Sequence, residues 1–237
     1  MKNIIKNNTE DLKYKYLGSG SFGDCYLTRA LFVYKEFNSP AISNIYDSMG
    51  YLCNHNNESF LFPISLVYID EIERENLRGY IRKYVSGVEL SKMPQNTSMY
   101  SFLDALSILE KDTKNISKDK IKINDLKDAN AFYNINNRIK VLDTDFYGVL
   151  KSTSFEQLYK LNLMELEYLI SRSIIKQNAL KFKNNSLIEY FEKTSEGKML
   201  PSDYLYEIIE EIENASKEEV HTYREFNEGL SLIMKKH

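Results

Sequence analysis

The first third of the chain alternates short apolar runs with glycine-rich and charged turns. These runs lie within residues 14–37, around Ile64–Ile69 and within Leu77–Val85. Runs of this length, rich in Tyr, Val, Leu and Ile and bounded by turn-forming residues, predict β-strands. One segment, Ala41–Cys53, instead repeats its apolar residues at helical spacing. The pattern therefore predicts a small antiparallel sheet accompanied by one helix.

The rest of the chain has mainly helical periodicity, after a break in the pattern at Ser86–Gly87. We expect this break to be a hinge between a strand-rich part, residues 1–85, and a helix-rich part, residues 86–237. The expected helices cover Tyr100–Leu109, Phe155–Gln177, Ser186–Lys193, Asp203–Ala215 and Lys217–Met234. Together these patterns predict an α+β protein whose sheet and helices form two lobes.

One stretch of the helix-rich part, Ile121–Gly148, departs from helical periodicity. Two short apolar runs, Ala131–Tyr133 and Ile139–Leu142, flank the turn-forming segment Asn134–Asn137 and predict a β-hairpin. A hairpin brings its two ends together, so the polar residues before and after it would face one another. Those residues are Asp125, Asn130, Asp143 and Asp145.

Converging carboxylates suggest a cation site. Because like charges repel, such groups need a positive partner, and oxygen ligands suit a hard divalent cation such as Mg²⁺. The alternative is that these are ordinary turn-forming Asp and Asn residues at strand ends. This stretch alone fits both interpretations equally well.

A glycine-rich turn near the N-terminus has the spacing G-x-G-x-x-G. Its residues are Gly18, Ser19, Gly20, Ser21, Phe22 and Gly23. Glycines at these positions let backbone N–H groups approach an anion closely, because no Cβ stands in the way. A dinucleotide-binding turn would lead directly into a helix, but here the strand-like run Cys25–Leu27 follows. The strand that follows therefore favours one interpretation, a flap that covers phosphates, and makes a plain glycine-rich hairpin the weaker alternative.

Composition narrows the class of protein. The 237 residues are 43% hydrophobic and 27% charged, as in soluble globular proteins. A net charge of −3 gives no support to nucleic-acid binding, which requires a basic surface. Two cysteines, no secretory leader and no long apolar run lead us to expect a cytoplasmic protein without a membrane partner.

The order of these elements resembles the protein kinase-like superfamily over residues 14–150. The turn Gly18–Gly23 is similar to the loop that covers the ATP phosphates in that family. Lys35 follows on the third strand, where the family's lysine binds the α- and β-phosphates. The resemblance further implies that Tyr84 and Val85, just before the hinge, contact the nucleotide.

The segment Asn124–Asn130, N-D-L-K-D-A-N, is similar to the family's catalytic loop H-R-D-L-K-x-x-N. The resemblance implies that Asp125 is the catalytic aspartate, which orients the acceptor hydroxyl and accepts its proton. It also implies that Lys127 steadies the transferring γ-phosphate and that Asn130 is a metal ligand.

Leu142-Asp143-Thr144-Asp145 falls where the family has D-F-G. Asp143 would then be the main Mg²⁺ ligand. Asp145 stands where the family has Gly, and it could be a second metal ligand, a helix cap or a surface charge. Ile123-Asn124 replaces the family's His-Arg before the catalytic Asp, so we expect no control by a phosphate on an activation loop.

The family's lysine is normally paired with a glutamate on a helix, and this chain has no obvious counterpart. The helix expected at 41–53 contains Asp47 as its only acid, and Glu58 lies in the loop that follows. Either acid could pair with Lys35, or neither does. The chain also has no A-P-E motif and few residues after Gly148, so the substrate-docking part is reduced or different.

These observations predict an ATP- and Mg²⁺-dependent phosphotransferase that moves the γ-phosphate to a hydroxyl group. The D-L-K-x-x-N segment favours Ser or Thr of a protein as the acceptor. Asp145 and the short remainder of the chain favour a small molecule instead. A kinase-like protein that binds a nucleotide or a partner without catalysis is the alternative from another class, since the metal motif is altered.

Overall fold

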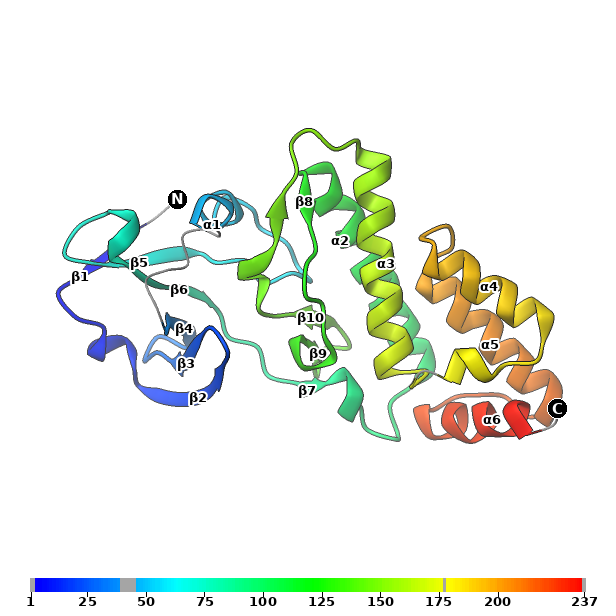
Figure 1. The fold of residues 1–237 in the computed structure, drawn as a ribbon. Helices are drawn as coiled ribbons and strands as arrows, with labels where there is room; N and C mark the ends of the chain where they lie inside the picture. Colours follow the sequence, from blue (N-terminus) through cyan, green and yellow to red (C-terminus); the bar gives the residue numbers. More distant parts are fainter. Residues whose placement is uncertain (1–2, 39–45, 177, 236–237) are drawn as a thin grey trace.

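The computed structural model describes residues 3–38, 46–176 and 178–235. The α+β class is confirmed: within these ranges a six-stranded sheet and six α-helices form the bulk of the protein. Figure 1 shows the large sheet at one end of the molecule, the helices α2 to α6 at the other, and the small strands β7 to β11 between them. Within the described ranges no helix combines the length and apolar content that a membrane span requires.

The large sheet has the strand order β1-β5-β6-β4-β3-β2. Its strands are β1 (Ile4–Lys6), β2 (Lys15–Gly20), β3 (Gly23–Leu27), β4 (Phe32–Phe37), β5 (Ser65–Ile69) and β6 (Leu77–Lys83). All neighbours pair antiparallel except β1, which runs parallel to β5. The predicted strands are confirmed, and β1 is an addition. Tyr84 and Val85 lie beyond the end of β6.

The helix expected at 41–53 is confirmed over its second half, where α1 (Tyr46–Leu52) lies. Residues 41–45 lie outside the described residues. Met49 and Leu52 of α1 are fully buried. Met49 packs with Tyr68 and Tyr80 of the sheet, so α1 covers one face of the sheet through apolar contacts.

The remaining helices pack around one large apolar core. They are α2 (Met99–Lys118), α3 (Phe155–Ser173), α4 (Asn185–Ser195), α5 (Pro201–Ser216) and α6 (Tyr223–Lys235). Ser98, Ser154 and Asn184 cap the first three by accepting backbone N–H groups. The prediction of a helix from 217 was wrong by six residues, because Lys217 adopts a left-handed conformation (φ 62°) that ends α5.

Two small sheets connect the large sheet to the helices. One has the order β10-β9-β7, formed by β7 (Val88–Glu89), β9 (Ala131–Tyr133) and β10 (Ile139–Val141). The other pairs β8 (Ile121–Lys122) with β11 (Gly148–Val149). The predicted hairpin is confirmed, since β9 and β10 pair antiparallel.

Helix α5 has no side-chain cap of its own, and a residue of α2 supplies one. Glu110 accepts the backbone N–H of Ser202 at 2.7 Å through Oε1 and its hydroxyl at 2.6 Å through Oε2. Glu110 is only 3% exposed, and this burial raises its pKa to about 7 despite the two hydrogen bonds. Between about pH 4.5 and 7, Glu110 is therefore mainly protonated in the folded protein, whereas the same carboxyl is mainly ionised in the unfolded chain.

We expect the free energy of unfolding to fall as pH rises from about 4.5 to about 8. A carboxyl group whose pKa is raised on folding stabilises below its unfolded pKa, and that stability is lost as pH rises through the folded pKa. The loss should reach about 3 kcal/mol at most. Urea unfolding across this range gives the slope of the free energy of unfolding against pH. This slope should be flatter in Glu110→Gln and unchanged in Glu210→Gln, which removes the same charge from the exposed face of α5. Equal slopes in both variants would contradict this origin.

Candidate functional site

Lys35 lies at the centre of a buried charge cluster. It is 3% exposed and stands on β4, opposite Cys25 of β3 and Tyr80 of β6. Its ammonium group contacts the carboxylates of both Asp143 and Asp145. The strand lysine and the two aspartates, more than a hundred positions apart in sequence, therefore meet in the structure.

The loop that carries these aspartates is held by hydrogen bonds to Ser59 and Leu61. On the side of β10, Val141 donates its N–H to Ser59 O at 2.7 Å and accepts the N–H of Leu61 at 2.9 Å. The hydroxyl of the fully buried Thr144 then donates to Leu61 O at 3.1 Å. Asp143 adopts the left-handed conformation, with φ 58°, which turns the chain sharply at this point. The hydrogen-bonded 3₁₀ segment Thr144–Phe146 thus carries Asp145, and Asp143 is the residue immediately before it.

Charge and burial act differently on the three groups. Burial by itself would lower the pKa of the Lys35 ammonium, but Asp145 and Asp143 outweigh it and the pKa is raised. Burial acts to raise the pKa of Asp143, yet Lys35 outweighs it and the pKa lies below its usual value. For Asp145, burial together with the negative charge of Asp143 prevails over Lys35, and the pKa is raised. Asp143 is thus the carboxylate that stays ionised most readily.

The predicted catalytic loop is positioned by two amide side chains, those of the buried Asn162 and the partly exposed Asn124. Asn162 of α3 is 0% exposed; it accepts the N–H of Ile123 at 2.8 Å and donates to Ile121 O at 2.9 Å. Asn124 donates to Phe146 O at 2.9 Å, which ties this loop to the loop of the two aspartates. Asp125 follows in the left-handed conformation, with φ 57°.

Asp125 and Lys127 form an ion pair of 2.6 Å at the surface, with side chains 40% and 54% exposed. Asn130 donates its amide nitrogen to Asp125 O at 3.3 Å, so its amide oxygen is the atom it can offer to a cation. The backbone of Asn130 also accepts the N–H of Leu142 at 2.7 Å. The structure therefore places Asn130 beside the start of the Asp143 turn, as the sequence predicted.

The donor set fits a hard divalent cation that is completed by other ligands. Asp143 offers a carboxylate that is 36% exposed, and Asn130 offers an amide oxygen. Within the described ranges, no group of three or more His, Cys, Asp or Glu side chains could hold a metal by itself. Mg²⁺ binds in this way, through one or two protein oxygens with phosphates and water filling its remaining positions.

The glycine-rich turn joins the ends of β2 and β3 and leans over the aspartate loop. The ring of Phe22, at its tip, lies 4.3 Å from that of Phe146, measured between centroids. Asn38 donates its N–H to Phe22 O at 3.1 Å. The turn thus covers the same loop that Lys35 contacts from the sheet.

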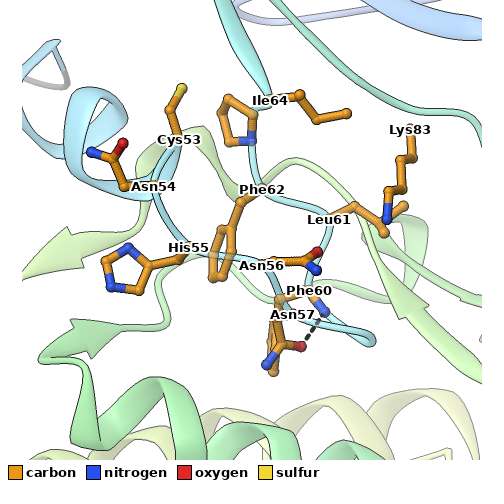
Figure 2. Close-up of a pocket in the computed structure, with 11 residues that line it drawn as sticks. Cys53, Asn54, His55, Asn56, Asn57, Phe60, Leu61, Phe62, Ile64 and Lys83 are labelled. Atoms are coloured by element: carbon orange, nitrogen blue, oxygen red, sulfur yellow. Dashed lines mark hydrogen bonds between the residues drawn. The ribbon is translucent and has the colours of Figure 1, made fainter. Parts of the chain in front are cut away.

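Two cavities lie beside the loop that follows α1. Figure 2 shows the first, of about 230 Å³, whose lining includes Cys53, His55, Phe62 and Lys83. The second, of about 320 Å³, is lined in part by the predicted nucleotide contacts Tyr84 and Val85. The residues that line these two cavities do not include Lys35, Asp143 or Asp145. Tyr84 and Val85 therefore line a cavity whose lining does not include the charged cluster.

Sequence reasoning missed the residues that hold the site in place. Tyr80 reads as one more strand aromatic, but its hydroxyl donates to Asp145 at 3.2 Å in a fully buried position. Asn162 reads as a polar position on an amphipathic helix, and Thr144 as the second residue of an altered motif. For these three the sequence carries no signal, because their partners are distant along the chain.

Comparison with protein-family models finds none that matches this chain, and comparison with curated proteins finds no matching sequence. Its function therefore has to be inferred from its own residues and their geometry.

Proposed function

We propose that this protein is an ATP- and Mg²⁺-dependent phosphotransferase with a kinase-like, two-lobed fold. Residues 1–85 would form the lobe of the sheet and residues 86–237 the helical lobe, with the nucleotide between them. One observation carries the proposal: Lys35 of the sheet meets Asp143, from the end of the β9–β10 hairpin, beneath the glycine-rich turn. These neighbours would serve as a phosphate-binding cation, a metal ligand and a flap at one point.

Each group has a task in phosphoryl transfer, which needs positioning and neutralisation of phosphate charge. The backbone N–H groups of Gly18–Gly23 and the ammonium of Lys35 would bind phosphate oxygens. Asp143 and Asn130 would hold Mg²⁺, which supplies charge neutralisation between the phosphates. Tyr84 and Val85 would contact the base from the connection between the lobes.

Asp125 would orient the acceptor hydroxyl and accept its proton. Its carboxylate is 40% exposed, so an acceptor can reach it from solvent. Lys127, paired with it at 2.6 Å, can turn to the transferring phosphate once that phosphate is present. The left-handed backbone at Asp125 is a costly conformation that the neighbouring hydrogen bonds maintain, as at many functional positions.

A Ser or Thr side chain of a protein is the acceptor that we favour, on the D-L-K-x-x-N segment. A small-molecule hydroxyl and a nucleotide-binding protein without turnover are the competing forms of the proposal. In each case the protein would work in the cytoplasm on ATP, without nucleic acid.

Incubation of the purified chain with Mg²⁺ and γ-labelled ATP tests the proposal. We expect labelled protein or labelled phosphate from the wild type and neither from Asp143→Asn, because that variant lacks the main metal ligand. Binding of ATP without any turnover would favour the non-catalytic form. The absence of both ATP binding and ATP turnover would refute the proposal.

A further inference from the structure

The two aspartates of the Asp143–Thr144–Asp145 turn differ sharply in exposure. The side chain of Asp143 is 36% exposed, whereas that of Asp145 is 0% exposed. A ligand that arrives from solvent can therefore reach Asp143 directly. Asp145 is closed off behind Lys35, which is itself nearly buried.

Both oxygens of Asp145 already have partners. Lys35 Nζ lies 3.0 Å from Oδ2 and 3.3 Å from Oδ1, and the hydroxyl of Tyr80 donates to Oδ1 at 3.2 Å. A buried carboxylate is tolerated only when it is paired and hydrogen-bonded in this way. A metal at Asp145 would have to displace partners from both oxygens, whereas Lys35 contacts Asp143 through Oδ1 alone.

We propose that Asp145 is a positioning residue for Lys35, supported by Tyr80, and not a ligand of the metal. The inference rests on the proposed function, in which Lys35 binds phosphate. An ammonium group on a long, flexible stem needs a fixed counter-ion if it is to present its remaining donor in one direction. The carboxylate of Asp145, both of whose oxygens contact the ammonium, supplies that counter-ion.

The acids that the sequence suggested for this task lie elsewhere. Asp47 is exposed on α1, and Glu58 pairs with Arg138 at 3.4 Å and Lys140 at 3.6 Å. Within the part of α1 that the structure describes, Asp47 is the only acidic residue. Lys35 is thus anchored to the turn that carries Asp143 and not to α1. The distance between the proposed phosphate-binding group and the proposed metal ligand therefore does not depend on the position of α1.

A double-mutant cycle on the ligand-free protein tests the ion pair without any appeal to ATP. We expect Lys35→Met and Asp145→Asn each to destabilise the protein in urea, and the double variant to lose less than the sum. The coupling should be about tenfold in the unfolding equilibrium constant. Asp47→Asn, which removes the same charge from α1, should show no coupling to Lys35→Met. Additive effects at Asp145 would overturn the proposal.

Two measurements then separate positioning from metal binding. At saturating ATP and Mg²⁺, Asp145→Asn should lower kcat about tenfold to a hundredfold through misplacement of Lys35, and should add nothing in the Lys35→Met background. The Mn²⁺ dissociation constant, measured by electron paramagnetic resonance with ADP present, should rise in Asp143→Asn and stay within about threefold of wild type in Asp145→Asn.

Equal loss of Mn²⁺ affinity in the two aspartate variants would overturn the proposal and make Asp145 a metal ligand. So would a decrease in kcat that persists in the Lys35→Met background. In either result a wild type that transfers phosphate keeps the proposed function intact. A wild type that neither binds nor turns over ATP refutes the proposed function instead, and the positioning role falls with it even if the cycle shows coupling.

Discussion

Replacing Asp125 with asparagine is expected to lower kcat by about a hundredfold to ten-thousandfold, the range that a positioned general base contributes. The amide keeps the shape of the side chain but cannot accept the proton of the acceptor hydroxyl. The affinity for ATP should change little, because the cluster around Lys35, where we propose that the phosphates bind, stands on other elements. Steady-state kinetics at saturating Mg²⁺ and ATP, together with equilibrium nucleotide binding, give both quantities.

Asp128→Asn is the matched control for this variant. Asp128 lies three residues further on in the same loop, and among the described residues its side chain accepts a hydrogen bond only from the backbone N–H of the neighbouring Ala129. We expect kcat within about twofold of wild type for it, as for most surface substitutions. An Asp125→Asn variant that is as active as Asp128→Asn would show that Asp125 is not the base.

Gly79→Ala is expected to destabilise the protein by about 3 kcal/mol or more, at the upper end of overpacking costs. A Cβ at this position would lie 1.9 Å from Lys35 O and 3.0 Å from Tyr34 Cε2. The backbone of β4 would have to move away from β6, and the Lys35 cluster would move with it. Urea unfolding measures the loss of stability, and binding of ATP should weaken in parallel.

Gly18→Ala provides the comparison, because a Cβ there meets nothing within 4 Å. We expect its free energy of unfolding to stay within about 0.5 kcal/mol of wild type. A Gly79→Ala variant with the same stability as Gly18→Ala would mean that β4 and β6 do not pair in this register. The strand contact on which the placement of Lys35 depends would then be wrong.

Local patterns were sufficient to predict most of the fold. The strands around the glycine-rich turn, the helix at α1 and the β9–β10 hairpin all have periodicity and turn residues within a few positions of one another. The misplaced start of α6 shows the limit of such patterns. The helical periodicity continues across Lys217, and only the left-handed conformation there ends α5.

The sequence predicted which residues would form the candidate site, but it did not predict which of them would contact one another. The hairpin indicated that Asp143 and Asp145 would face Asn130, but nothing local indicated that Asp145 would be buried against Lys35 and Tyr80. Burial of a carboxylate depends on which distant elements close over it, and short-range patterns do not encode this. The cap that Glu110 provides for α5 could not be predicted from local sequence for the same reason.

The most direct test is a crystal structure of the protein with Mg²⁺ and a non-hydrolysable ATP analogue. We predict Mg²⁺ at about 2.1 Å from an oxygen of Asp143 and from the amide oxygen of Asn130, with Lys35 within hydrogen-bonding distance of the phosphates. The carboxylate of Asp145 should stay on Lys35. An analogue bound away from Lys35, for example in the cavity of Figure 2, or none bound at saturating concentration, would contradict the account.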